Sequence, residues 1–264
     1  MTGPPWGGMY AAFFTIMDMT LKYNINRLGI FLDGHASTAQ AATEYAVGNP
    51  GVFTAVICRH LDSAPSAKNL ENARNIRFLL LSPAEGDGAK LVADFAEEAK
   101  SKGVEAEVVT ASIGEDGMPD EVGQTALANL LSNTTKKTAP ERIQFTTSSQ
   151  EKVNAYWLHL LKMEVSEDRP ITVKAEIDRA ANEIRVTTPP DVRMFRVYLN
   201  DDLIDMGKSI RLVHTVIKDD TPEATVRFEG TKPRSLEKAQ TIWFDNLSGN
   251  FGEVYTNFIE VEIP

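Results

Sequence analysis

The chain has 264 residues, of which 42% are hydrophobic and 24% charged, a composition typical of a globular protein with a sizeable core. Its 27 basic and 37 acidic residues give a formal net charge of -10, which disfavours nucleic acid and anionic lipid headgroups as partners. The single cysteine, Cys58, excludes an internal disulfide, and its apolar neighbours predict a buried side chain.

The sequence contains no apolar run long enough to cross a membrane and no signal-peptide pattern. The chain as given is therefore expected to be soluble and not inserted in a membrane. A secreted or periplasmic location stays open if the natural protein begins further upstream.

Residues 6–131 alternate between helical and extended patterns. Helices are expected at residues 9–21, 36–47, 90–102 and 121–131, and strands at residues 29–33, 52–58, 76–81 and 104–110. Strands that are apolar throughout and alternate with helices are typical of a parallel sheet covered on both faces. We therefore expect an α/β architecture for this half.

The pattern changes after about residue 133 to short segments of period two, which are typical of strands. Such segments lie at residues 171–177, 183–186, 193–199, 209–214, 224–228 and 258–263. They predict an all-β sandwich of seven or eight strands, immunoglobulin-like in general build. The expected division is residues 1–136 for the α/β part and residues 137–264 for the sandwich.

Residues 29–59 show, in this order, a strand, a sharp turn, an alanine-rich helix, an Asn-Pro break and a second strand. The turn reads Asp33-Gly34-His35-Ala36-Ser37-Thr38, and the second strand reads Phe53-Thr54-Ala55-Val56-Ile57. This succession resembles the nucleophile region of α/β-hydrolases, particularly polyester-depolymerase and prolyl-oligopeptidase-like esterases. The resemblance extends over residues 6–131 and implies a truncated α/β-hydrolase domain that comprises only the C-terminal half of the family's sheet.

The same resemblance implies a degenerate catalytic triad. Ala36 occupies the nucleophile position, and a methyl group cannot attack a carbonyl. Asp87 occupies the acid position, whereas Glu115 or Asp116 stands where the family has its histidine. Because triad residues act as a unit, these substitutions imply that no ordinary serine-hydrolase activity, and no catalytic residue, should be expected.

An enzymatic alternative stays open through Ser37, one position after Ala36. A shift of the turn by one residue would make its hydroxyl the nucleophile of a carboxylic-ester or peptide hydrolase, with Asp87 orienting a base such as His35 or His60. The competing interpretation is structural: Ser37 belongs to the first turn or cap of a helix, and Asp87 is a turn or cap residue.

The resemblance further implies that earlier strands, which carry the oxyanion-hole donors, are absent from this chain. Without them the strand that opens at Gly29 and ends at Asp33 would be an uncovered sheet edge. We expect a protein partner or a second copy to cover it, unless the chain is a fragment of a longer protein. The first hypothesis is therefore a catalytically inactive hydrolase relative that acts as a binding, structural or assembly subunit.

The acidic clusters lack the spacing of a known calcium loop and there is no phosphate-binding glycine loop, so neither a metal nor a cofactor is expected.

Overall fold

The computed structural model describes residues 14–16, 18–19, 22–23, 25–65, 68–150, 153–245 and 254–263. The helix predicted at residues 9–21 lies largely outside these residues, and the described part of it is helical at residues 14–16 and 18–19. None of the helices in the described ranges combines the length and the apolar character that crossing a membrane requires.

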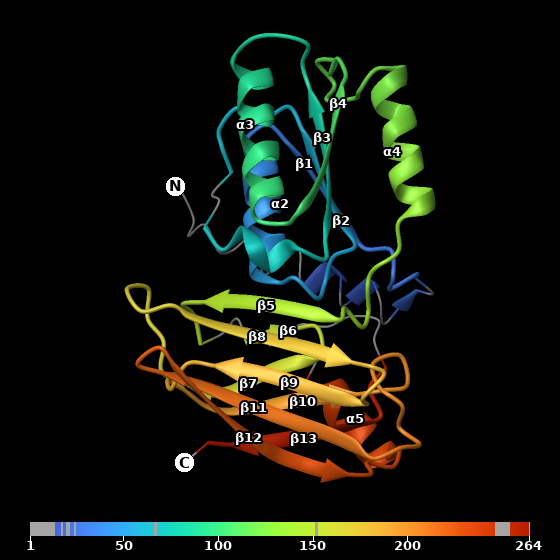
Figure 1. The fold of residues 1–264 in the computed structure, drawn as a ribbon. Helices are drawn as coiled ribbons and strands as arrows, with labels where there is room; N and C mark the ends of the chain where they lie inside the picture. Colours follow the sequence, from blue (N-terminus) through green and yellow to red (C-terminus); the bar gives the residue numbers. More distant parts are fainter. Residues whose placement is uncertain are drawn as a thin grey trace.

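The first part of the chain forms a four-stranded parallel sheet in the order β1-β2-β3-β4. Helices α2 and α3 lie on one face of this sheet and α4 on the other (Figure 1). The elements are β1 (Phe31–His35), α2 (Ser37–Gly48), β2 (Ala55–Arg59), the 3₁₀ helix η1 (Leu70–Ala73), β3 (Arg77–Ser82), α3 (Asp87–Ser101), β4 (Glu105–Thr110) and α4 (Glu121–Asn133).

The apolar side chains along the central strands point to the two faces of the sheet in turn, which explains why helices cover both faces. Val56 and Cys58 of β2 pack in the core cluster with α2 and α3, whereas Ala55 and Ile57 pack toward Leu130 of α4. Since side chains of a strand point to opposite faces in turn, an uninterrupted apolar run can serve two layers at once. The predicted burial of Cys58 is confirmed, because its side chain has no exposed surface.

The second part of the chain forms two sheets that enclose the larger core (Figure 1). One sheet has the order β12-β11-β9-β8-β5 and the other β13-β10-β7-β6; every pairing is antiparallel except that between β9 and β11. The elements are β5 (Arg142–Thr147), β6 (Asn154–Ala155), β7 (Leu158–Met163), β8 (Ile171–Asp178), β9 (Glu183–Thr188), β10 (Val192–Leu199), β11 (Ile210–Lys218), β12 (Thr221–Gly230), α5 (Leu236–Asp245) and β13 (Asn257–Glu262).

The predicted fold class, a partial α/β-hydrolase sheet followed by an immunoglobulin-like sandwich, is wrong. The structure is mostly β, with 38% strand against 25% helix, and its described residues form three sheets. A hydrolase-type parallel sheet is not evident in the described residues. The physical reason is that most of the chain's strands, β5 to β13, lie after residue 140 and outweigh the helices around the small parallel sheet.

The two parts are joined through η1 and β5. The Asn72 side chain donates to the carbonyls of Thr146 and Val47 at 2.9 and 3.2 Å and accepts from the Thr146 amide at 2.8 Å. Lys136 donates from a buried position to the Gly51 carbonyl at 2.9 Å. The sandwich therefore lies beneath the amino ends of the parallel strands, and their carboxyl ends point away from it (Figure 1).

Candidate functional site

The sequence-predicted site residues gather at the carboxyl edge of the parallel sheet, where open α/β sheets bind ligands. His35 ends β1, His60 follows β2, Asp87 begins α3 after β3, and Glu115 lies in the loop that follows β4. The carboxyl ends of parallel strands meet at one edge, which explains why residues far apart in the sequence share this region.

Ala36 forms the apex of a sharp strand-to-helix turn. Its backbone has φ 52° and ψ -122°, a combination that residues with a side chain rarely adopt. Its amide donates to the Arg59 carbonyl at 3.0 Å, which ties the apex to the end of β2. A Cβ atom on Gly34 would lie 2.5 Å from the Ala39 Cα, so the strand and the helix cross too closely for any larger residue at position 34.

Ser37 is the first residue of α2, and its side chain is exposed. The hydroxyl that holds the turn belongs instead to Thr38, which accepts from the His35 amide and donates to the His35 carbonyl, both at 2.8 Å. Sequence reasoning missed Thr38, although a hydroxyl residue in the first turn of a helix is a known signal for such bonds.

His35 and His60 lie near each other above the sheet edge, with 6.4 Å between their ring centroids. A Cβ on Gly117 would lie 3.7 Å from His35 Nδ1, and one on Gly88 would lie 3.6 Å from His60 Cε1. Neither imidazole is hydrogen-bonded to a carboxylate within the described ranges, so the orienting contact of a catalytic triad is not formed there. The other two histidines lie buried in the sandwich: His159 contacts the Tyr198 hydroxyl, and His214 contacts that of Thr188.

The loop after β4 carries Glu115 and Asp116 in a hydrogen-bonded turn. Asp116 Oδ1 accepts from the Met118 amide at 3.0 Å, while Glu115 is exposed to solvent. The loop is fixed by Arg59, which donates to the Gly117 carbonyl at 2.6 Å and pairs with Asp33 at 2.8 Å. Sequence reasoning missed the Asp33–Arg59 pair, because nothing in the local pattern of either residue indicates a partner 26 positions away.

Asp87 is an exposed residue in the first turn of α3, a position that is electrostatically suited to a carboxylate whatever the function. The next helix begins similarly: the side chain of Asp120 caps α4, and hydrogen bonds from the Gly123 and Ser112 amides lower the pKa of its carboxyl group. Among the described residues no group of three or more His, Cys, Asp and Glu is arranged to hold a metal ion.

Among the described residues, β1, for which the sequence predicts an uncovered edge, is the terminal strand of the parallel sheet, and it pairs with β2. Its apolar residues Phe31 and Leu32 are half-buried, and Ile16 packs in the same core cluster as Leu32. The structure thus places the edge where the sequence predicts it, with apolar side chains that are only partly covered by the described residues.

Comparison with family models, with curated proteins and with solved structures found no match to this chain. The function of the protein must therefore be inferred from the residues and contacts described above.

Proposed function

We propose that the protein is a binding, structural or assembly subunit, related to the α/β-hydrolases, in which the turn at Ala36 has lost the hydroxyl needed for acyl transfer. The observation that carries this proposal is the backbone of Ala36, which keeps φ 52° and ψ -122° although its side chain ends in a methyl group. In hydrolases such a strained turn presents the nucleophile. In this chain the turn presents the methyl group of Ala36 instead.

The surroundings of the turn support the same conclusion. Glu115 and Asp116 stand where the resemblance places the base, and a carboxylate is a weaker base than an imidazole. It also returns a proton to a leaving group less efficiently than imidazole does. A nucleophile and its base would both have to be supplied by other residues.

Ser37 is the alternative nucleophile, because it follows Ala36 directly and its side chain is exposed. Using it at the apex requires a shift of the turn by one residue. That shift would break the two hydrogen bonds between Thr38 and His35 and would place the His35 side chain at the close crossing now occupied by Gly34. The steric cost of the shift favours the non-hydrolytic proposal over a serine esterase or peptidase.

We further propose that a second copy or another protein pairs with the β1 edge. An edge strand with apolar side chains and unpaired backbone groups favours strand addition. The solution mass measured by light scattering tests this proposal: a homodimer or a stable hetero-complex supports it, and a monodisperse monomer that captures no partner contradicts it.

A fluorophosphonate probe tests the absence of a serine nucleophile. The full chain is incubated with the probe, digested and mapped by mass spectrometry, beside an active serine hydrolase as positive control. We expect no adduct on Ser37 and an identical result for Ser37→Ala. An adduct on Ser37 that disappears in Ser37→Ala would support the esterase alternative.

A further inference from the structure

A groove of about 290 Å³ opens on the outer face of the five-stranded sheet. Eight of its ten lining residues are polar, whereas pockets for small molecules are lined mainly by apolar side chains. Two rows of residues that are paired across β5, β8 and β9 provide most of the wall: Arg142, Glu176 and Arg185 in one, and Gln144, Lys174 and Thr187 in the other.

The lining of the groove is cationic although the chain as a whole carries a net charge of -10. Four positive side chains meet one carboxylate there, that of Glu176. Arg74 reaches the groove from the segment after η1 and donates to Gln144 Oε1 at 3.1 Å. A concentration of positive charge on an acidic protein indicates a surface that attracts an anionic group.

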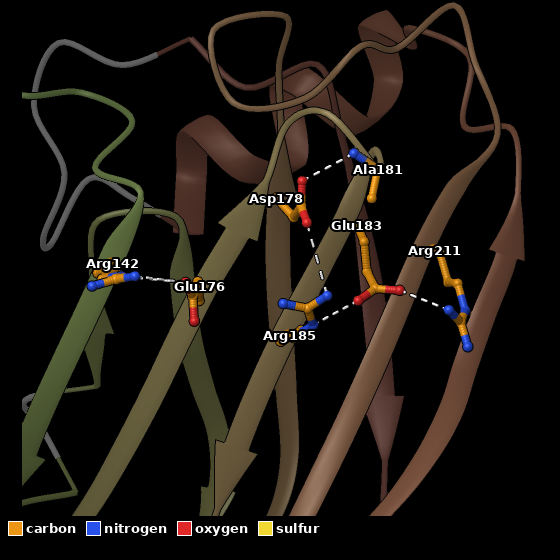
Figure 2. Close-up of polar contacts among 7 residues, drawn as sticks. All are labelled: Arg142, Glu176, Asp178, Ala181, Glu183, Arg185 and Arg211. Atoms are coloured by element: carbon orange, nitrogen blue, oxygen red, sulfur yellow. Dashed lines mark hydrogen bonds and ion pairs between the residues drawn. The ribbon is translucent and has the colours of Figure 1, made fainter.

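Figure 2 shows that two of these cations, Arg185 and Arg142, already contact carboxylates, and that Arg142 contacts Glu176. Arg185 pairs with Glu183 at 2.6 Å and lies 3.9 Å from Asp178, and Arg211 approaches the same buried Glu183 at 2.8 Å. Arg185 therefore serves the sheet itself rather than an incoming ligand.

Lys174 has no carboxylate partner among the described residues, and Arg142 is the more exposed of the two groove cations that have one. Arg142 contacts a single oxygen of Glu176, with both nitrogens at 3.2 Å, and its side chain is 82% exposed. Lys174 has no ion pair or hydrogen bond to any described residue, and its cross-strand neighbours Gln144 and Thr187 are uncharged. An anion could reach both side chains without displacing a buried contact.

We propose that this groove binds an extended, acidic segment of a partner protein, with two carboxylates on alternate residues facing Lys174 and Arg142. These two residues are diagonal neighbours on antiparallel strands, which places them about 7–8 Å apart, with their Cβ atoms somewhat closer. Alternate residues of an extended segment are about 6.8 Å apart and point to the same side. The spacing of the two residues on the sheet thus matches that of side chains at positions i and i+2 of an extended segment.

The proposal rests on this groove and stands whether or not the turn at Ala36 hydrolyses esters. Its test uses the ¹⁵N-labelled full chain titrated with the peptide (Glu-Thr)₄, with (Gln-Thr)₄ as the uncharged control. We expect saturable chemical-shift changes in β5 and β8 with the glutamate peptide only. Saturable changes with both peptides, or with neither, would overturn the proposal.

Variants locate the contact. Lys174→Gln should weaken binding about 2- to 5-fold, the range expected for one exposed ion pair, and Lys174→Glu should weaken it further. Lys162→Gln, an exposed lysine on β7 of the other sheet, is the matched control and should leave the affinity unchanged. An unchanged affinity for Lys174→Gln, or a response of Lys174 to tripolyphosphate but not to the peptide, would contradict an acidic protein segment as the occupant.

Discussion

Replacing Ala36 by glycine tests the strained turn directly. Alanine at φ 52° and ψ -122° occupies a backbone region in which a side chain costs about 1–3 kcal/mol. Glycine adopts the same region without that cost, because it has no Cβ atom. It also makes the unfolded chain more flexible, which offsets about 0.4–1 kcal/mol of the gain.

We therefore expect Ala36→Gly to raise the free energy of unfolding by about 1.3 kcal/mol, the difference between the midpoints of those two ranges. For a chain of this size each kcal/mol corresponds to a rise in Tm of roughly 2–4 °C. Urea denaturation followed by circular dichroism, with calorimetry for the Tm, measures both quantities. The gain requires no new contact, so it reports on the backbone alone.

Ala41→Gly provides the matched control. Ala41 is an exposed residue inside α2, where glycine costs about 0.5–1 kcal/mol relative to alanine. The same substitution five positions apart should thus change stability in opposite directions. If Ala36→Gly destabilises the protein as much as Ala41→Gly does, the apex is not strained and the reasoning about the turn is refuted.

Three further predictions concern buried positions. Gly34→Ala should destabilise the protein by about 1–3 kcal/mol or more in urea denaturation, since its Cβ would lie 2.5 Å from the Ala39 Cα; wild-type stability would show that the crossing is looser than described. Burial raises the pKa of the Cys58 thiol to about 11, so iodoacetamide at pH 8 should modify it only after unfolding, and rapid alkylation of the native protein would contradict this. Burial, with the charge of Arg227, lowers the pKa of His214 from 6.5 to about 4. Because the unfolded chain takes up this proton at higher pH than the folded one, stability should be complete above pH 6.5 and fall by roughly 3 kcal/mol toward pH 4, and His214→Gln should reduce that slope.

The elements of the parallel sheet were predictable because their local signals agree with their tertiary environment. The strand expected at residues 76–81 is β3 (Arg77–Ser82), and the helix expected at residues 121–131 is α4 (Glu121–Asn133). Their apolar periodicity is set by burial on one or two faces, which the sequence records directly. Most strands of the second part were found for the same reason, including β8 (Ile171–Asp178).

Other elements lack such a signal. Strand β7 (Leu158–Met163) is buried on both sides over its first three residues, so it shows no alternation, and helix α5 (Leu236–Asp245) was missed altogether. The predicted fold class was wrong because the resemblance to hydrolases concerns only the first half of the chain. The β elements of the second half determine the class. Local sequence patterns do not show which strands join to form which sheet.

The candidate site likewise has one part that the sequence predicts and another that it does not. Ala36, Asp87 and Glu115 were placed at one sheet edge by topology, which sequence order predicts once the strands are parallel. The contacts that hold this edge, such as Arg59 on the Gly117 carbonyl, depend on pairs 58 positions apart, for which a single sequence carries no signal. The groove near Lys174 was missed because its walls are brought together by the pairing of β5, β8 and β9 and by Arg74 from the first part of the chain.

Steady-state hydrolysis of a p-nitrophenyl ester by the purified full chain tests the proposed loss of acyl transfer most directly. Because the side chain of Ala36 is a methyl group, we expect the ester to be hydrolysed no faster than in buffer alone. We expect the same rate for Ser37→Ala. Turnover above the buffer that Ser37→Ala abolishes would contradict the central claim.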